Sequence, residues 1–322
     1  MMDAPRRVAA VVSAFRDDVL AGLSAPIPAV PARWLYDRRG SELFEQITEL
    51  PEYYLTRTER PLLETYCPAV ARIAGSGQVV VEFGSGSSIK TPILLRAVAP
   101  SAYVPIDISG DFLRDAAAAL QAEFPNLPIH PVEADFMRPI TLPPQVARAS
   151  KLGFFPGSTI GNLVPRTAVD LLRAMKETLG AGSHLLIGMD RVKDPQILMR
   201  AYDDSAGVTA EFNLNLLHRI NAELGADIPV DAFRHRAIWN DRMSRIEMHL
   251  EAVRDAEFTI CGRAFSFRAG STIHTENSHK YGLRDSRLLL RAAGWGVVEE
   301  WTDEEDGFAL ILAEAEAPRF AP

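Results

Sequence analysis

The sequence predicts an α/β fold in which a mainly parallel sheet carries helices on both faces. Two observations support this prediction. Between residues 78 and 190, short apolar runs alternate with stretches of helical spacing, as in strands joined by crossover helices. Beyond residue 190 this alternation stops: residues 194–224 are helical in pattern, and the residues after them alternate as antiparallel strands do. The chain therefore predicts an α/β domain that is interrupted by an α+β insertion.

The expected elements of the α/β domain follow in regular order. Strands are expected at residues 79–81, 102–106, 129–133, 152–155 and 184–189, and helices at 91–98, 111–123 and 168–179. In the last of these helices, apolar residues recur at spacings of three and four, and Gly180 is placed to end it. The insertion is expected to hold a strand at 246–250 and a hairpin that turns at 261–263, and the tail a helix at 285–293 and strands at 295–301 and 308–313.

Composition limits the class of protein. At 322 residues the chain can bury a sizeable core in one large or two moderate domains. A net charge of −8 gives no support to a nucleic-acid partner, whose phosphates favour a basic face. No apolar run has membrane-spanning length, and residues 1–23 lack the unbroken apolar core of a secretory signal. Cys67 and Cys261 have no C-x-x-C spacing, which favours a reducing compartment. We therefore expect a cytoplasmic protein without nucleic-acid or membrane partners.

A glycine-containing loop follows the first expected strand. It reads Glu82-Phe83-Gly84-Ser85-Gly86-Ser87-Ser88. At the end of a strand in a Rossmann-like sheet, Gly84 and Gly86 let the backbone approach a ligand closely. The third glycine of the dinucleotide pattern G-x-G-x-x-G would fall on Ile89, and the loop has no arginine for a pyrophosphate. The loop therefore argues against an NAD-dependent dehydrogenase, and its ligand need not be phosphorylated.

Polar residues at the neighbouring strand ends point to S-adenosylmethionine. This ligand has a sulfonium cation and an amino-acid head, which Lys90 and backbone N–H groups could hold. Asp107 is placed to accept the ribose hydroxyls, and Asp135-Phe136 to contact the adenine. Because ligands bind outside the carboxyl ends of parallel strands, we expect these residues to gather there with the acidic Glu82. Each aspartate alone is about as well explained as a helix N-cap, but the ordered set favours the cofactor.

Three longer motifs resemble one known family. They are Phe155-Pro156-Gly157-Ser158-Thr159-Ile160-Gly161-Asn162-Leu163, Leu50-Pro51-Glu52-Tyr53-Tyr54-Leu55-Thr56-Arg57-Thr58-Glu59 and Arg200-Ala201-Tyr202-Asp203-Asp204-Ser205-Ala206-Gly207-Val208-Thr209. From about residue 21 to about residue 313, the chain resembles the histidine Nα-methyltransferases of ergothioneine biosynthesis, which convert L-histidine to its trimethyl betaine, hercynine. The resemblance implies a Rossmann-like methyltransferase fold, with residues 62–193 and 284–318 binding S-adenosylmethionine. A second domain of N-terminal helices and insertion, residues 1–61 and 194–283, would bind the substrate.

The resemblance also implies roles for individual residues. The cofactor contacts would be Gly84, Lys90, Asp107, Asp135 and Phe136, in agreement with the reading above. The histidine substrate would lie between the two domains. There Asn162 and Tyr202 match carboxylate-holding residues, and Gly157, in the motif that carries Asn162, is also expected to bind the substrate. Tyr53 matches a residue that fixes the substrate and Tyr36 one near its amino group, so these two tyrosines are the expected catalytic residues.

Glu276 and Ser278 match the pair that reads the imidazole. A neutral imidazole offers one donor and one acceptor, and a carboxylate beside a hydroxyl can satisfy both. His274 and His279 come without a ligand set of zinc spacing, so we expect no metal. The resemblance implies three successive methyl transfers from S-adenosylmethionine to the α-amino group of L-histidine. We expect the protein to be a monomer. Two alternatives stay open: an N-methyltransferase of another amino acid or histidine derivative, and a cofactor-binding protein without catalysis.

Overall fold

The computed structural model describes residues 4–86 and 89–317, with side chains described from residue 12 onward. The chain forms two compact units. Unit 1 comprises Met1–Tyr53 and Asp194–Ser278, and unit 2 comprises Tyr54–Lys193 and His279–Pro322. The domain boundaries expected after residues 61 and 283 fall within the first helix of unit 2 and at the start of its last helix. The assignment of a cofactor role and a substrate role to two domains stays a prediction.

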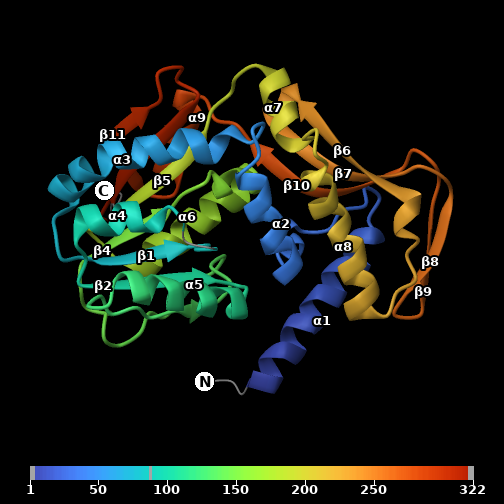
Figure 1. Cartoon of the computed structure of the whole chain (residues 1–322), viewed down its shortest axis with the longest axis horizontal. Helices are drawn as coiled ribbons and strands as arrows, with labels where there is room; N and C mark the ends of the chain where they lie inside the picture. Colours follow the sequence, from blue (N-terminus) through green and yellow to red (C-terminus); the bar gives the residue numbers. More distant parts are fainter. Residues whose placement is uncertain (1–3, 87–88, 318–322) are drawn as a thin grey trace, which may run out of the picture. The chain divides into compact units, whose positions relative to one another are not determined.

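Unit 2 is built on one twisted sheet (Figure 1). Its strands are β1 (Val79–Phe83), β2 (Ala102–Asp107), β3 (Val132–Glu133), β4 (Lys151–Phe155), β5 (His184–Asp190), β11 (Trp295–Thr302) and β12 (Phe308–Ala315). They lie in the order β11-β12-β5-β4-β1-β2-β3. The neighbours from β5 to β3 pair in parallel, whereas β12 runs antiparallel to both β5 and β11. This is the Rossmann-like sheet that the alternating pattern predicts.

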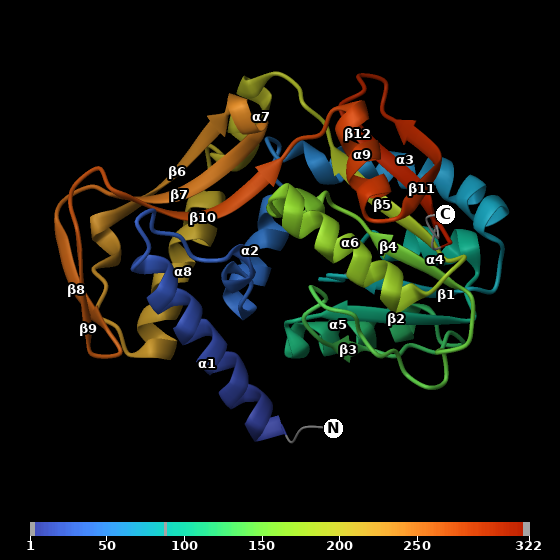
Figure 2. The same ribbon diagram turned by 180° about the vertical axis from the view of Figure 1, so that it is seen from behind.

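Helices cover both faces of this sheet. They are α3 (Tyr54–Ala74), α4 (Thr91–Val98), α5 (Gly110–Glu123), α6 (Pro165–Leu179) and α9 (Leu283–Ala292), with the short 3-10 helix η2 (Thr159–Asn162) after β4. Within β1, Val79, Val81 and Phe83 join the core beneath α6 and α9, while Val80 joins the core beneath α3 and α4. Figure 1 shows α3 and α4 in front of the sheet, and Figure 2 shows α6 and α9 on the opposite face.

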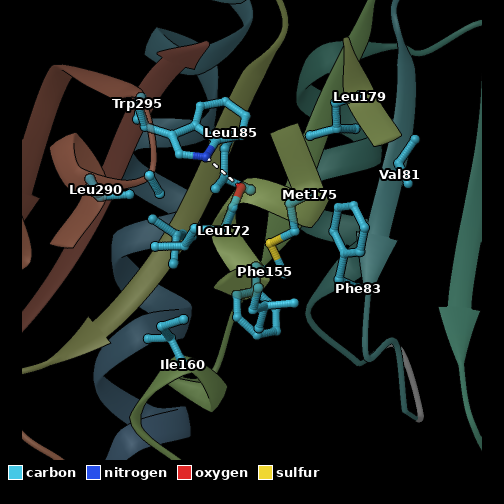
Figure 3. Close-up of a cluster of buried hydrophobic side chains, with 14 of the residues drawn as sticks. Val81, Phe83, Phe155, Ile160, Leu172, Met175, Leu179, Leu185, Leu290 and Trp295 are labelled. Atoms are coloured by element: carbon cyan, nitrogen blue, oxygen red, sulfur yellow. Dashed lines mark hydrogen bonds between the residues drawn. The ribbon is translucent and has the colours of Figure 1, made fainter. Parts of the chain in front are cut away.

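Close packing of apolar side chains holds α6 and α9 against the sheet (Figure 3). Trp295 is fully buried there, and its indole N–H donates to the carbonyl of Leu172 at 2.9 Å, so its polar atom is satisfied. Each fully buried aliphatic or aromatic side chain in such a cluster stabilises the fold by about 1.5–3 kcal/mol. The core therefore fixes the strand ends from which the candidate site projects.

The strand expected at 129–133 is shorter in the structure. Ile129 forms an isolated bridge with Tyr103, and the regular pairing with β2 covers Val132–Glu133 alone. Pro131 lies between them, and its missing N–H interrupts the ladder. The strand is thus split at the residue that cannot donate a hydrogen bond.

Unit 1 combines N-terminal helices with the inserted α+β segment. Its helices are α1 (Ala4–Leu23), α2 (Arg38–Thr48), α7 (Pro195–Tyr202) and α8 (Val208–Leu224), with 3-10 turns η1 (Ala32–Leu35), η3 (Val230–Ala232) and η4 (Asp241–Met243). Strands β10 (Thr272–His279), β7 (Arg245–Ala252) and β6 (Phe233–Asn240) form one sheet, and β8 (Ala256–Ile260) and β9 (Arg263–Phe267) form a hairpin. The hairpin turn has positive φ at Cys261 (+49°) and Gly262 (+78°), as tight two-residue turns require.

Two strands of unit 1 carry no apolar alternation that would predict them. In β10 the buried positions include Thr275, Glu276, Ser278 and His279, so its inward side chains are largely polar. In β6, charged and polar residues alternate with few buried apolar ones. Among the described residues, no helix has the length and apolar character needed to cross a membrane.

Candidate active site

The glycine loop leaves β1 with its backbone tied to the next strand. The N–H groups of Gly84 and Ser85 donate to the carbonyl of Ile106 at 2.8 and 3.1 Å. Gly84 and Gly86 have φ values of +70° and +50°, which side chains rarely tolerate. A Cβ at Gly86 would meet no heavy atom within 4 Å, so there is open space beside the loop. Ser87 and Ser88, the end of the predicted loop, lie outside the described residues.

Asp107 holds the loop from the end of β2. One carboxylate oxygen accepts from the N–H of Gly86 at 3.0 Å, and the other accepts from the N–H of Ser109 at 2.9 Å. Burial raises the pKa of Asp107, and the backbone donors oppose that rise. The structure thus brings Asp107 to Gly86, as the strand-end argument predicts.

Phe136 forms an aromatic surface beside the same loop. Its ring lies at centroid distances of 6.4 Å from Phe83 and 6.0 Å from Phe155, both edge-on. A Cβ at Gly84 would lie 3.4 Å from this ring, in van der Waals contact. Asp135 is exposed, and its carboxylate accepts from the N–H of Met137 at 3.0 Å. The aromatic ring of Phe136 and the carboxylate of Asp135 therefore lie in the segment that follows β3.

Glu82 is buried beneath the loop. A single oxygen of its carboxylate accepts from the hydroxyls of Thr91, at 2.7 Å, and Tyr103, at 2.6 Å. Burial raises the pKa of Glu82 to about 7, although these hydrogen bonds act in the opposite direction. The side chain joins the end of β1 to the first residue of α4 and to β2. Its described contacts are thus ones that shape the loop.

Lys90 and Gly157 meet at a residue that sequence reasoning missed. Glu59 of α3 is fully buried, and its carboxylate pairs with the Lys90 ammonium at 2.5 Å. Both of its oxygens lie 2.9 Å from the N–H of Gly157, which donates to them. A Cβ at Gly188 would approach Glu59 to 2.2 Å, so only glycine leaves room for this carboxylate. One buried acid thus fixes a predicted cofactor residue and a predicted substrate residue.

A sequence signal for Glu59 exists. It follows Leu55 by four residues and precedes Leu62 and Leu63 by three and four, so it occupies the apolar stripe of α3. A carboxylate at such a position must be paired when it is buried. It also closes the motif 50–59 that carries the family resemblance.

Asn162 ends η2, the turn that follows β4. The turn begins with Ser158 at a φ of +60°, and it packs closely: a Cβ at Gly161 would lie 2.8 Å from the carbonyl oxygen of His279. The hydroxyl of Tyr281 donates to the carbonyl of Ile160 at 3.2 Å. Asn162 therefore sits on a rigid turn in unit 2, in the same unit as the glycine loop.

The remaining predicted residues lie together in unit 1. The Tyr36 hydroxyl donates to the Glu276 carboxylate at 3.3 Å, and the hydroxyls of Tyr202 and Ser278 are 2.6 Å apart. Glu276 and Ser278 are two residues apart in β10, so both side chains project from the same face. A carboxylate and a hydroxyl are thus presented side by side, each against a tyrosine.

Aromatic rings surround this polar pair. The Tyr36 ring packs against Phe44 and Phe212, with centroids 5.6 and 5.4 Å away. The centroid of the Tyr53 ring lies 6.2 Å from that of Phe44 and 6.3 Å from that of Tyr202. Burial raises the pKa of the Tyr36 hydroxyl well above its ordinary value, and the charge of Glu276 raises it further. At neutral pH Tyr36 is therefore a hydrogen-bond donor.

The predicted site residues thus fall into two groups. Unit 2 contains Glu82, Gly84, Gly86, Lys90, Asp107, Asp135, Phe136, Gly157 and Asn162, and unit 1 contains Tyr36, Tyr53, Tyr202, Glu276 and Ser278. Across residues 4–86 and 89–317, no three or more His, Cys, Asp or Glu side chains are grouped so that they could hold a metal ion. The chemistry available comes from carboxylates, hydroxyls, amides and an ammonium group.

Known proteins resemble this chain along most of its length. The profile of the family described as "Histidine-specific methyltransferase, SAM-dependent" matches residues 15–315. A histidine N-alpha-methyltransferase of Mycolicibacterium smegmatis is 43% identical over 306 residues, which cover 93% of this chain and 94% of that protein. An ergothioneine biosynthesis protein 1 of Neurospora crassa is 30% identical over 295 residues, 89% of this chain but 33% of that longer protein. A solved S-adenosylmethionine-dependent methyltransferase from Clostridium acetobutylicum matches with a TM-score of 0.50 at 9% identity, covering 86% of this chain and 99% of that one, which is a likeness of fold.

Proposed function

The chain belongs to the S-adenosylmethionine-dependent, histidine-specific methyltransferases, and we propose that it converts L-histidine to hercynine by three methyl transfers to the α-amino group. Hercynine formation would be the first step of ergothioneine biosynthesis. The similar Neurospora crassa protein takes its name from that process. The observation that carries the proposal is the polar pair Glu276 and Ser278, which is buried on one face of β10 among aromatic rings.

This pair suits a neutral imidazole. The ring has one N–H donor and one acceptor nitrogen. The carboxylate of Glu276 accepts the N–H, and the hydroxyl of Ser278 donates to the other nitrogen. A side chain that lacks either of these groups would cover Glu276 and Ser278 without making both hydrogen bonds, which disfavours other amino acids. The proposed substrate class therefore follows from the hydrogen-bonding chemistry of this pair rather than from size.

The residues of unit 2 fit S-adenosylmethionine. The carboxylate of Asp107 has remaining lone pairs for ribose hydroxyls, and Phe136 offers an apolar face to the adenine ring. Positive φ at Gly84 and Gly86, with open space beside Gly86, allows a ligand close to the backbone. Lys90 offers donors to a carboxylate. When bound, S-adenosylmethionine supplies the electrophilic methyl group.

The chain's own contribution to the chemistry is alignment and exclusion of water. A displacement at the methyl carbon requires an accurately placed neutral amine. The α-amino group of a chain titrates near pH 8 and that of a free amino acid somewhat higher, so a proton must leave the substrate before its nitrogen attacks. Tyr36 stays protonated at neutral pH, so we propose that Tyr36 and Tyr53 orient the amine and that the proton leaves to water. The substrate contacts of Gly157, Asn162 and Tyr202 stay predictions.

A direct assay tests the proposal. Purified protein is incubated with S-adenosylmethionine and each of the free amino acids in turn, and products are identified by mass spectrometry. Histidine should yield mono-, di- and trimethylhistidine in sequence, and the Glu276→Ala variant should yield far less. Methylation of another amino acid or of a histidine derivative in place of histidine would support the alternative acceptor. Tight cofactor binding without turnover on any amine would support the non-catalytic reading.

We further propose that the protein works in the cytoplasm as a monomer, with no nucleic-acid or membrane partner. Cys67 and Cys261 are both free thiols, as in proteins of reducing compartments. Light scattering of the purified protein checks the oligomeric state, and fractionation of cells checks the compartment.

A further inference from the structure

A fully buried carboxylate, Asp190, lies at the end of β5. One oxygen accepts from the hydroxyl of Tyr54 at 2.5 Å and from the ammonium of Lys280 at 2.7 Å. The other accepts from the ammonium of Lys193 at 2.6 Å and from the N–H of Arg191 at 3.1 Å. Asp190 therefore joins the start of α3, the segment after β5 and the segment after β10. All of these residues belong to unit 2.

The charges of this cluster are strongly coupled. Burial by itself raises the pKa of Asp190, but Lys280 and Lys193 outweigh it and hold the pKa below its ordinary value. Lys280 is itself buried, and the Lys193 ammonium lies 3.9 Å from the centroid of the Tyr54 ring. A buried ion pair of this kind adds little stability over an apolar core, but losing one partner is costly. The arrangement thus favours one geometry of the three segments over others.

The partners of Asp190 mark the places where the chain passes between the units. These passages lie between residues 53 and 54, between 193 and 194, and between 278 and 279. Tyr54 and Lys193 are the unit 2 residues at the first two passages, and Lys280 is the second residue after the third. The backbone reinforces the third: the N–H of Tyr281 donates to the carbonyl of Asp190 at 2.9 Å. A single carboxylate therefore contacts a residue at or next to each of these passages.

Predicted substrate residues lie next to the tied positions along the chain. Tyr53 directly precedes Tyr54, and Ser278 lies two residues before Lys280. The backbone N–H of Asp190 also donates to the hydroxyl of Ser158 at 2.9 Å, and Ser158 directly follows Gly157. The position of each of these residues depends on a segment that Asp190 holds.

We propose that Asp190 is a positioning residue, whose carboxylate fixes the backbone at Tyr54, Lys193 and Lys280 and thereby places the histidine-binding residues that adjoin them along the chain. The effect on histidine rests on the proposed function above, whereas the effect on the passages does not. Asp190 acts through Tyr54, Lys193 and Lys280 and does not itself contact the substrate.

Hydrogen–deuterium exchange tests the hold on the passages without any substrate. Exchange of backbone amides is followed by mass spectrometry in peptides that contain Tyr54, Lys193 and Lys280. In Asp190→Asn these peptides should exchange faster than in the parent, whereas peptides of α5 should keep their rate. Unchanged exchange in all three peptides would overturn the proposal.

A binding measurement tests the consequence for the substrate. Tyr54→Phe removes one hydroxyl and leaves both lysines paired, so it keeps the fold even if Asp190→Asn does not. In Tyr54→Phe, loss of a hydrogen bond to a charged group should weaken histidine binding about tenfold and S-adenosylmethionine binding less than about twofold, by calorimetry. The control is Glu300→Gln, which removes a largely buried carboxylate paired with the guanidinium groups of Arg191 and Arg287 and leaves every partner of the Asp190 carboxylate in place.

The outcomes separate the two proposals. Equal weakening of both ligands, or the same effect in Glu300→Gln, would show a general loss of structure and overturn the positioning role. If the unaltered protein binds S-adenosylmethionine but no histidine, the proposed function fails, and the exchange rates at Tyr54, Lys193 and Lys280 still decide the role of Asp190.

Discussion

Replacing Glu82 by glutamine tests whether a protonated acid supports the glycine loop. The pKa of this carboxyl rises from 4.5 to about 7 on burial. The folded protein therefore retains a proton that the unfolded chain has released. A raised pKa in the folded state stabilises the protein fully below the unfolded value, and this contribution is lost as the pH rises through the folded value. At about 1.4 kcal/mol per pKa unit, the loss between pH 5 and pH 8 is about 2–3 kcal/mol.

Glutamine mimics the protonated acid. Its amide oxygen can accept from Thr91 and Tyr103 as the Glu82 oxygen does, but it does not titrate. We therefore expect the variant to lack this loss. The measurement is urea unfolding followed by tryptophan fluorescence between pH 5 and pH 8, for both proteins. Subtracting the variant from the unaltered protein removes the contributions of the histidines, which titrate in both.

A second variant checks the assignment of the effect. Thr91→Val keeps the shape of the side chain and removes a donor that lowers the pKa of Glu82. The loss of stability should persist in this variant, with its midpoint moved to higher pH. The free energies of unfolding of the unaltered protein and of Glu82→Gln would refute the reasoning if they differed by a constant amount from pH 5 to pH 8. Glu82 would then carry the same charge in the folded and the unfolded state.

Three further changes test other parts of the structure. Glu276→Ala leaves the imidazole N–H without its acceptor and should weaken histidine binding about a hundredfold, or about 3 kcal/mol, in calorimetry. S-adenosylmethionine binding should weaken less than about twofold; equal losses would argue against an imidazole contact. Asp107→Asn loses the charge and one of the two hydrogen bonds that the carboxylate accepts from the backbone. It should weaken S-adenosylmethionine binding about tenfold and leave histidine binding unchanged; an unchanged affinity for S-adenosylmethionine would exclude Asp107 from the cofactor site. Gly188→Ala places a Cβ 2.2 Å from Glu59 and should lower the free energy of unfolding by about 1–3 kcal/mol in urea titrations. Gly307→Ala should change it little, because its Cβ would approach the side chains of Asp303 and Lys193 to no less than 3.3 Å; similar losses in both would contradict the role of close packing.

Much of the α/β unit could be predicted from the sequence because the patterns that mark its strands and helices involve neighbouring residues. Apolar runs marked β1, β2, β4 and β5, and spacings of three and four marked α6 with Gly180 at its end. The order of these elements was enough to predict a Rossmann-like sheet. Where the pattern was weaker, single residues decided the outcome: Pro131 divides the third strand, and the polar inward face of β10 hid that strand from a search for apolar alternation.

The sequence by itself determined the type of the sheet, the glycine loop and the family, because periodicity, strand-end chemistry and long motifs are properties of neighbouring residues. Only the tertiary structure decided which buried charges meet. Glu59 pairs with Lys90 and binds Gly157, Glu82 faces Tyr103, and Asp190 pairs with Lys280, although these partners are far apart along the chain. The physical reason is that a carboxylate is protonated, paired or exposed according to how much water surrounds it, and packing between distant segments sets that.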